Sequence, residues 1–238
     1  MVDFHTHILH GIDDGSASVQ TSVSMIKALK EQGVSKVILT PHFYAYLSST
    51  AMFVKRRESA LKELIQELKE ENVEIELYQG CEVLYFEELW RVEDLSEFCI
   101  KGTDYILIEM PFSPWTDSIV GCIEKIIGMG LTPILAHFER YIPYKGNMHK
   151  IYHLMNLGVL LQMNCAYLGK FTTRRKALKF IKKGMVFALG TDSHDMEKRS
   201  PNYSAAVKYL EKKLPRNKLT RLVCGPERLL SSAIRVYP

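Results

Sequence analysis

Short strand-like runs alternate with longer helical segments along almost the whole chain, and this alternation limits the folds that the chain can adopt. The helical segments include residues 18–32, where apolar side chains recur at helical spacing before Gly33, and residues 51–71. The runs that predict strands are residues 2–5, 36–40, 74–82, 104–110, 132–137, 158–164 and 185–192. About seven strands that alternate with helices predict a parallel α/β fold, either a closed barrel or a doubly wound sheet.

Polar side chains at the ends of these strands favour the barrel. In a closed parallel barrel the carboxyl ends of all strands meet at one mouth, whereas an open sheet spreads them along an edge. Ligand-type side chains end almost every predicted strand: His5 and His7, His42, Glu82, Glu109, His137, Asn164, Asp192 and His194. No Pro-rich or Gly-rich linker divides the 238 residues, so we predict one small barrel domain over residues 1–238.

Composition and charge exclude several classes of protein. The chain is 47% hydrophobic and 24% charged, which is typical of a globular domain rather than a disordered one. The net charge of +4 is mild and the basic clusters, such as residues 55–57 and 174–176, are scattered, so no nucleic-acid partner is indicated. We interpret residues 55–57 as part of a solvated helix face. Without a signal peptide or an apolar run of about 18 residues, we expect a cytoplasmic protein with no membrane insertion.

The cysteines and three absent motifs exclude other catalytic chemistry. Five widely spaced cysteines without a C-x-x-C pair predict buried, reduced thiols. None of them is followed six residues later by arginine, so the phosphate-binding loop of cysteine-dependent phosphatases is absent. The chain also lacks a D-x-D pair for an aspartyl-phosphate route and a P-loop for nucleotide hydrolysis.

The polar strand ends predict a centre with several metal ions. His5 and His7 lie two residues apart on an extended segment, which suits two imidazoles that share an ion, although such a pair alone is a weak signal. Five histidines and four carboxylates in one mouth require cations, because charged side chains are rarely buried without partners. Oxygen and imidazole ligands without thiolate favour manganese, iron or zinc. Three divalent ions and four carboxylates would leave a charge of about +2, which suits a phosphate ester.

The motifs that carry these residues resemble a known superfamily. They are DFHTH, IDDG, TPH, GCE, HFERY, QMN and TDSH, with Arg199 five residues beyond His194. Together they resemble the PHP (polymerase and histidinol phosphatase) superfamily, and within it the bacterial manganese-dependent protein-tyrosine phosphatases of the capsular-polysaccharide type. The resemblance extends from Val2 to about Arg199, with a GPERLL motif nearer the end. It implies a single-domain, distorted TIM-like (β/α)7 barrel of the PHP type.

The resemblance also implies a role for each ligand residue. It assigns one ion to His5, His7, Glu82 and Asp192, a second to Glu82, Glu109 and His137, and a third to Asp14, His42 and His194. Three divalent ions are expected, with manganese first and iron or zinc as alternatives. Arg140 and Arg199 match positions that hold the substrate phosphate, a role suited to bidentate donors, and His42 completes the expected catalytic set. Phe138 stands where the family usually has proline, which could alter the wall of the mouth.

The implied reaction is hydrolysis of phosphotyrosine without a covalent enzyme intermediate. Water activated by the ions would attack phosphorus, while the arginines neutralise the phosphate oxygens. The phenol leaving group has a pKa of about 10, so its protonation is less critical than for an alkyl phosphate. By resemblance, the substrate is the phosphotyrosine-containing tail of a bacterial tyrosine kinase that regulates capsular or exopolysaccharide synthesis.

Two other functions remain open at this point. The same barrel could carry a small-molecule phosphatase of the histidinol-phosphate type or a phosphodiesterase. Alternatively, the metal centre could belong to a regulatory module without catalysis.

Several polar and aromatic residues near the predicted site have an uncertain role in the sequence alone. His10, Gln162 and Asn164 could support the ligands, and Asp3 could either orient His5 or His7 or cap the first turn of the barrel. Either loop packing or lining of the mouth would explain Phe112, Trp115 and Tyr141. We interpret His149 and His153, four apart in a predicted helix, as an exposed helix face rather than a metal-binding pair.

Overall fold

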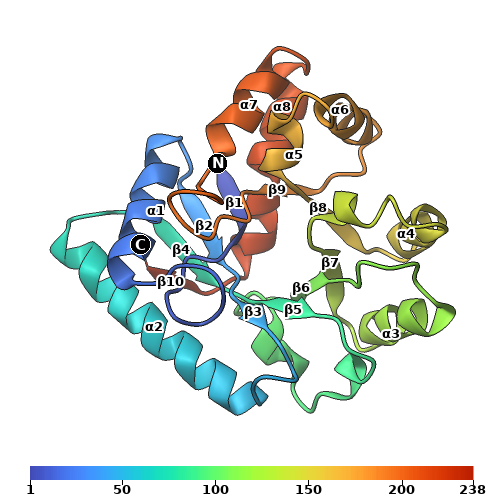
Figure 1. Ribbon diagram of the computed structural model, residues 1–238, viewed down its shortest axis with the longest axis horizontal. Helices are drawn as coiled ribbons and strands as arrows, with labels where there is room; N and C mark the ends of the chain where they lie inside the picture. The colour runs from blue at the N-terminus through green and yellow to red at the C-terminus, as the bar shows by residue number, and fades with distance from the viewer. Residues whose placement is uncertain (238) are drawn as a thin grey trace.

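The strands of the computed structural model, which describes residues 1–237, form two hydrogen-bonded sheets (Figure 1). One sheet has the order β1-β2-β4-β10 and the other the order β3-β5-β6-β7-β8-β9. Their bounds are β1 (Val2–Thr6), β2 (Lys36–Leu39), β3 (His42–Phe43), β4 (Glu76–Gln79), β5 (Glu82–Leu84), β6 (Tyr105–Glu109), β7 (Thr132–Leu135), β8 (Leu160–Asn164), β9 (Ala188–Gly190) and β10 (Arg235–Tyr237). All pairs are parallel except β10 with β4.

Backbone contacts join the two sheets into a distorted barrel. On one side, the Asp192 amide donates to the His5 carbonyl at 2.8 Å and the His7 amide donates to the Ser193 carbonyl at 2.9 Å. On the other side, β2 and β3 are two parts of one interrupted strand, as are β4 and β5, and the Gly80 amide donates to the Leu39 carbonyl at 2.9 Å. The predicted α/β barrel of seven parallel strands is therefore confirmed, and the antiparallel β10 is an addition that was not predicted.

The helices form an outer layer around the strands (Figure 1). Their bounds are α1 (Val19–Glu31), α2 (Thr50–Glu70), α3 (Asp117–Gly128), α4 (Asn147–Asn156), α5 (Cys165–Gly169), α6 (Arg174–Lys182), α7 (Tyr203–Glu211) and α8 (Arg216–Val223), with short 3-10 turns η1 (Leu89–Arg91), η2 (Leu95–Phe98), η3 (Phe138–Arg140) and η4 (Gly225–Ser231). Ser18, Ser49 and Thr116 cap the first turns of α1, α2 and α3, where each hydroxyl accepts a backbone N–H. The predicted helices at residues 18–32 and 51–71 match α1 and α2.

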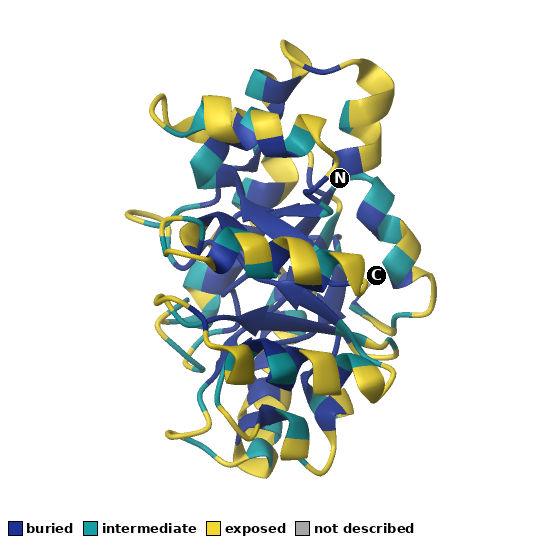
Figure 2. Ribbon diagram, turned by 90° about the vertical axis from the view of Figure 1, so that its right-hand side faces the viewer, coloured by how far each residue is buried: buried dark blue, intermediate teal, exposed yellow. Residues whose placement is uncertain are grey.

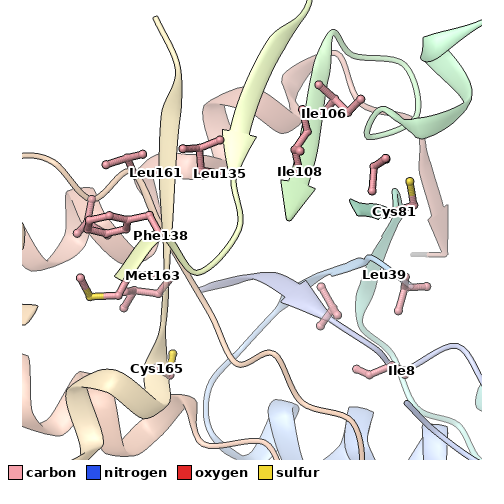
Figure 3. Close-up of a cluster of buried hydrophobic side chains, with 14 of the residues drawn as sticks. Ile8, Leu39, Cys81, Ile106, Ile108, Leu135, Phe138, Leu161, Met163 and Cys165 are labelled. Atoms are coloured by element: carbon pink, nitrogen blue, oxygen red, sulfur yellow. The ribbon is translucent and has the colours of Figure 1, made fainter. Parts of the chain in front are cut away.

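Two apolar clusters separate the outside of the barrel from its inside. Ile106, Ile108 and Leu135 point to the cluster between the sheet and the helices (Figure 3). Leu107 and Ile134, one residue along on the same strands, belong to a second cluster. Since alternate residues of a strand face opposite sides, Leu107 shares its face with Glu109. The second cluster therefore fills the barrel below the polar mouth, and exposed residues lie on the outer sides of the helices (Figure 2).

Two side chains differ from the sequence-based interpretation. Arg57 is buried rather than part of a solvated face: its guanidinium donates to the carbonyls of Gly80 and Glu97, at 3.3 and 2.8 Å. The interpretation holds for Lys55 and Arg56, which are exposed. Phe138 is fully buried and packs edge-on against Phe180 in the outer cluster, so it does not form a wall of the mouth.

No helix within residues 1–237 is both long enough and apolar enough to cross a membrane.

Candidate metal centre

The carboxyl ends of the strands bring nine ligand-type side chains into one cluster. Most of these side chains stand at a strand end or just beyond it, because in a parallel barrel all strands point to the same mouth. They are His5, His7, Asp14, His42, Glu82, Glu109, His137, Asp192 and His194. All except Asp14 are buried.

Glu82, which begins β5, is the central carboxylate of the cluster. Its Oε2 lies 2.9 Å from the His5 Nε2 and 3.2 Å from both the His7 Nε2 and the His42 Nδ1, and its Oε1 lies 3.0 Å from the His137 Nε2. The side chain is fully buried. Burial by itself would raise the pKa of Glu82, but the surrounding imidazoles hold that pKa well below its usual range. The carboxylate is therefore charged and faces four rings.

The other carboxylates extend the cluster on both sides of Glu82. Glu109 lies 3.3 Å from the His137 Nε2. Asp192 lies 3.4 Å from the His7 Nε2 and 3.8 Å from the His5 Nε2. Ligand atoms lie within 4.8 Å of one another in three overlapping groups: His7, Asp14, His42 and His194; His5, His7 and Asp192; and His42, Glu82 and Glu109.

These side chains fit a centre with several divalent ions. The His42 Nδ1 and the His194 Nε2 are buried and make no hydrogen bond, although they lie 3.2 Å from Glu82 and 3.4 Å from Asp14. The Nε2 atoms of His5 and His7 face each other at 3.0 Å. These ring nitrogens face carboxylates or one another, and hydrogen bonds do not satisfy them all. Bound cations would satisfy both the nitrogens and the carboxylates. The donor set of oxygen and imidazole nitrogen suits manganese, iron or zinc.

A second layer of polar groups orients the histidines and Asp192. The Asp13 carboxylate lies 2.7 Å from the His7 Nδ1 and also accepts the His42 amide at 2.7 Å. Asn164 Nδ2 donates to Asp192 at 2.7 Å, and the Gln162 carbonyl oxygen lies 3.0 Å from the His5 Nδ1. Gln162 and Asn164 thus contact ligand-type side chains, as the sequence suggested. Such partners fix the tautomer and direction of a ligand ring.

Two supporting residues lie elsewhere than expected. Asp3 does not contact an imidazole; its carboxylate accepts the backbone amides of His5 and Thr191 and the Thr191 hydroxyl, and so connects β1 to β9. The His10 Nε2 pairs with Glu63 of α2 at 3.1 Å rather than with a ligand side chain. Asp13 takes the orienting role that the sequence left open for Asp3.

Arg140 and Arg199 lie at the rim of the cluster. Their guanidinium groups hold the two oxygens of Asp192, with Arg140 at 2.6 Å from Oδ2 and Arg199 at 2.8 Å from Oδ1. Arg199 also lies 3.5 Å from Asp14. The two side chains are 40% and 38% exposed, so each keeps part of its donor fork open to solvent at the mouth. Both arginines are therefore placed to meet an anion that enters there.

Comparison with known proteins assigns the family. A model of the family described as capsular polysaccharide synthesis, CpsB/CapC, matches residues 1–231. The chain belongs to the CpsB/CapC family. Relatives include the tyrosine-protein phosphatase CpsB of Streptococcus pneumoniae, 26% identical over 97% of this chain and 98% of the relative, and the tyrosine-protein phosphatase YwqE of Bacillus subtilis, 29% identical over 89% and 84%.

Solved structures agree with this assignment to the CpsB/CapC family. The fold superimposes on a chain from the crystal structures of YwqE from Bacillus subtilis and CpsB from Streptococcus pneumoniae, both metal-dependent tyrosine phosphatases. The TM-score is 0.86 at 26% identity, with 100% of this chain and 98% of the other covered. An organophosphorus hydrolase from Deinococcus radiodurans shares the fold alone, with a TM-score of 0.58 at 11% identity over 96% and 91% of the chains.

Strained or crowded backbone positions flank the ligands of this CpsB/CapC member. His137 and Asp192 have φ angles of 29° and 53°, a region that residues other than glycine rarely adopt and that clusters at functional sites. At Gly15 a Cβ atom would lie 2.3 Å from the His7 carbonyl oxygen, and at Gly190 it would lie 2.5 Å from the His5 Cβ. Glycine at these two positions lets the neighbouring backbone approach His7, just after β1, and His5, within β1.

Aromatic rings lie on two sides of the cluster. Tyr44 stacks on His42 with ring centroids 4.8 Å apart, and Phe112 stacks on His137 at 5.9 Å. Phe112 is 46% exposed, whereas Trp115 and Tyr141 are buried and pack beneath it. Only Phe112 of the three predicted aromatic candidates therefore lies at the mouth. Tyr44 was not predicted, and its position two residues after the TPH motif is the signal that could have indicated it.

His149 and His153 lie outside the cluster. Both are exposed on α4, and His153 pairs with Glu124 of α3 at 2.7 Å. This agrees with the interpretation of an exposed helix face.

The cysteines carry no activated thiol at the mouth of this family member. Cys81, Cys99, Cys122 and Cys165 are buried, and burial raises the pKa of each thiol, to about 12 for Cys99. Cys224 is partly buried beside α8. Since nucleophilic cysteines need a lowered pKa, these four buried residues do not support cysteine chemistry.

Proposed function

We propose that this protein is a metal-dependent phosphatase that hydrolyses phosphotyrosine in proteins. One observation carries the proposal: nine ligand-type side chains, with Glu82 at their centre, come together at a mouth that also presents two arginines. Membership of the CpsB/CapC family and the tyrosine-protein phosphatases among its relatives support the substrate. A role limited to metal storage or regulation would not require guanidinium donors at the rim.

The proposed cofactor is a set of three divalent ions, with manganese first and iron or zinc as alternatives. His5, His7, Glu82 and Asp192 would hold one ion, Glu82, Glu109 and His137 a second, and Asp14, His42 and His194 a third. When bound, such ions supply Lewis acidity, which neutralises phosphate oxygens and makes water a stronger nucleophile near neutral pH.

The protein's own residues supply position and charge for the reaction. Arg140 and Arg199 present planar donors that match phosphoryl oxygens, and both already contact a carboxylate at the mouth. Asp13 and Gln162 fix the rings of His7 and His5, so little reorganisation is needed when substrate binds. Phe112 offers an exposed ring beside the cluster for the substrate's aromatic ring.

The leaving group suits this arrangement. A tyrosine phenol has a pKa of about 10, so it departs with less help from a general acid than an alkyl alcohol. No nucleophilic side chain is required. The proposal therefore does not depend on a thiol or on an aspartyl-phosphate.

We propose the phosphotyrosine-containing tail of a bacterial tyrosine kinase as the physiological substrate, with the reaction in the cytoplasm. The family description, capsular polysaccharide synthesis, supports a role in capsular or exopolysaccharide production. We also propose that residues 1–238 act as one catalytic domain.

Turnover measurements on three substrates test the proposed function. Protein purified without chelator is analysed for metal and assayed with manganese on a phosphotyrosine peptide, histidinol phosphate and a dinucleotide. We expect the phosphotyrosine peptide to be preferred, and preference for either of the other two would contradict the proposal. His42→Ala and Arg140→Ala should abolish most turnover without unfolding the barrel, whereas Lys62→Ala on the exposed face of α2 should not.

A further inference from the structure

Positive charge is concentrated in two segments that contain none of the nine ligands. Residues 170–183 contain seven basic residues and no acidic one, and residues 208–221 contain six basic residues and one acidic residue. These segments therefore carry a formal charge of +12. Since the whole chain carries +4, the remaining residues carry −8. A charge asymmetry of this size indicates an anionic partner.

The two segments form one surface, which we call the basic end. The Arg174 guanidinium of α6 lies over the Tyr209 ring of α7, 5.5 Å from its centroid, and α5 packs against both helices. Figure 1 shows α5, α6, α7 and α8 gathered at one end of the barrel. The basic side chains of the surface are exposed apart from the partly exposed Arg174: Lys170, Arg175, Lys176, Lys179, Lys182, Lys183, Lys208, Lys212, Lys213, Arg216, Lys218 and Arg221.

Among residues 1–237, no carboxylate lies within ion-pair distance of a charge of the basic end. Within residues 1–237, the lysines and arginines that lie within 4.0 Å of a carboxylate all belong to other segments: Lys27, Lys36, Arg57, Arg140, Lys150, Arg199 and Arg235. The like charges of the basic end repel one another in the free protein. An anionic surface that neutralises several of them together would be attracted to this end.

An exposed aromatic ring stands at the edge of the basic end. Phe171 is 72% exposed, and the Arg174 guanidinium lies 4.3 Å from its ring centroid. Phe171 follows β8 and α5, so it leaves the barrel from the end at which the strands point to the mouth. An exposed aromatic side chain surrounded by lysine and arginine is typical of proteins that bind at the membrane–water interface.

We propose that the basic end binds the surface of an anionic lipid bilayer. Lysine is the most frequent basic residue of the surface, and its ammonium group acts as a compact point charge rather than as a bidentate donor to individual phosphates. The basic side chains are exposed and belong to helices, and to the loops beside them, in the outer layer of the barrel, which suits a flat partner. The lysines would contact acidic headgroups and Phe171 would enter the interface, while the barrel stays outside the bilayer.

Sedimentation with lipid vesicles tests the proposal on the full chain. At about 100 mM NaCl, where charges are screened beyond about 10 Å, the protein should sediment with phosphatidylglycerol-containing vesicles and not with pure phosphatidylcholine vesicles. The variant K176E/K179E/K183E should lose at least about tenfold in vesicle partitioning, because each basic residue near an anionic bilayer contributes additively. Phe171→Ala should weaken vesicle binding severalfold. The ratio of binding between the parent protein and this variant should stay the same at higher salt.

A matched variant separates the local surface from net charge. K55E/K62E/K69E makes the same change in net charge on exposed positions of α2, so it should retain partitioning within about threefold of the parent protein. Both triple variants should hydrolyse a soluble phosphotyrosine peptide at the parent rate, which shows that they are folded. Equal loss by the two triple variants would overturn the proposal, as would absence of binding to the anionic vesicles or binding to duplex DNA without binding to vesicles.

Discussion

Asp13 illustrates how much of the site depends on single side chains that bind no substrate. Its carboxylate contacts the ring of His7 and the backbone amide of His42, two residues that lie 35 positions apart in the sequence. Burial tends to raise the pKa of Asp13, but the charge and hydrogen bond of His7 lower it. Burial also opposes charge on His7, yet Asp13 and the neighbouring carboxylates raise the His7 pKa well above its ordinary value. The pair thus directs the other ring nitrogen of His7 toward Glu82.

Replacement of Asp13 should weaken metal binding. In Asp13→Asn an amide group replaces a carboxylate that pairs with the His7 ring and accepts the backbone amides of Gly15 and His42, so the His7 ring loses its fixed orientation. We expect affinity for manganese to fall roughly 10- to 100-fold, measured by metal titration, with turnover restored at high manganese concentration. Asp117→Asn on exposed α3 is the control. Unchanged affinity in Asp13→Asn would show that the carboxylate does not orient His7.

Phe112 is expected to contact the aromatic ring of the substrate. Its exposed ring lies beside His137 at the mouth. Phe112→Ala should raise KM for a phosphotyrosine peptide about two- to tenfold, because an aromatic pair contributes about 0.5–1.5 kcal/mol. In Phe112→Ala, the KM for a phosphate ester without an aromatic ring should stay unchanged. In the control variant Phe171→Ala, the KM values for both substrates should stay unchanged. An equal rise for both substrates would contradict direct ring contact.

At the scale of elements, close contacts between neighbouring strands determine where the ligands lie. Gly190 of β9 lies close to both neighbouring strands. A Cβ atom at this position would lie 2.5 Å from the His5 Cβ of β1 and 2.9 Å from the Gln162 side chain of β8. His5 lies in β1, Gln162 lies in β8, and Asp192 follows β9 by two residues. A side chain at position 190 would therefore collide with His5, a ligand-type residue, and with Gln162, which contacts it.

Gly190→Ala should destabilise the barrel. The added methyl group meets the His5 side chain and backbone, so we expect a loss of about 1–3 kcal/mol in the free energy of unfolding. Gly121→Ala in α3 is the matched control, since nothing lies within 4 Å of its Cβ position. This variant should raise the free energy of unfolding by up to about 1 kcal/mol. Urea denaturation of both variants measures the difference. Equal effects at the two positions would contradict the close approach of β9 and β1.

The pair between Lys36 of β2 and Glu76 of β4 should give a pH-dependent contribution to stability. The two residues are in register, and their charged groups lie 2.7 Å apart. Partial burial tends to raise the pKa of Glu76, but Lys36 and the Tyr78 hydroxyl lower it from 4.5. The stabilisation is therefore present above the unfolded pKa and is lost as the pH falls through the lower folded pKa.

Lys36→Met should accordingly lower the free energy of unfolding by less than about 1 kcal/mol at pH 7, because the ion pair is partly solvated. The difference in the free energy of unfolding between Lys36→Met and the parent protein should become smaller as the pH falls and Glu76 is protonated. Chemical denaturation between neutral and acid pH measures this trend, and Lys55→Met serves as a control without an ion pair. A difference that grows in acid would contradict the assigned direction.

At the scale of the whole molecule, the metal centre connects strands from both ends of the chain. The nine ligand-type residues extend from His5 to His194, so ions bound there would join β1, β3, β5, β6, β7 and the segment after β9. Ions that bind only the folded state stabilise it by mass action. The barrel and its cofactor are therefore expected to be thermodynamically coupled.

Removal of metal should lower thermal stability as well as abolish turnover. At a manganese concentration about 100 times Kd, linkage contributes about 2.7 kcal/mol, or roughly 5–10 °C in Tm for a chain of this size. Scanning calorimetry of chelator-treated and manganese-loaded protein measures the shift. Glu82→Gln should reduce it, because the central carboxylate loses its charge. Identical Tm values with and without manganese would contradict metal binding by the folded barrel.

The sequence alone determined the order and type of the main elements, because apolar spacing at periods of two and 3.6 residues is a local property. It also determined that histidines and carboxylates follow the strands, and the parallel arrangement then brings them to one mouth. The resemblance of the motifs indicated the family, which the comparisons confirmed.

Only the tertiary structure decided the features that depend on distant contacts. Burial of Arg57 follows from the carbonyls of Gly80 and Glu97, and the direction of Phe138 into the outer cluster follows from its packing on Phe180. Asp13, rather than Asp3, orients His7 because the loop after β1 folds back over the mouth. No local pattern specifies the contacts of Arg57 and Phe138, since their partners lie tens of residues away and meet only when the barrel closes.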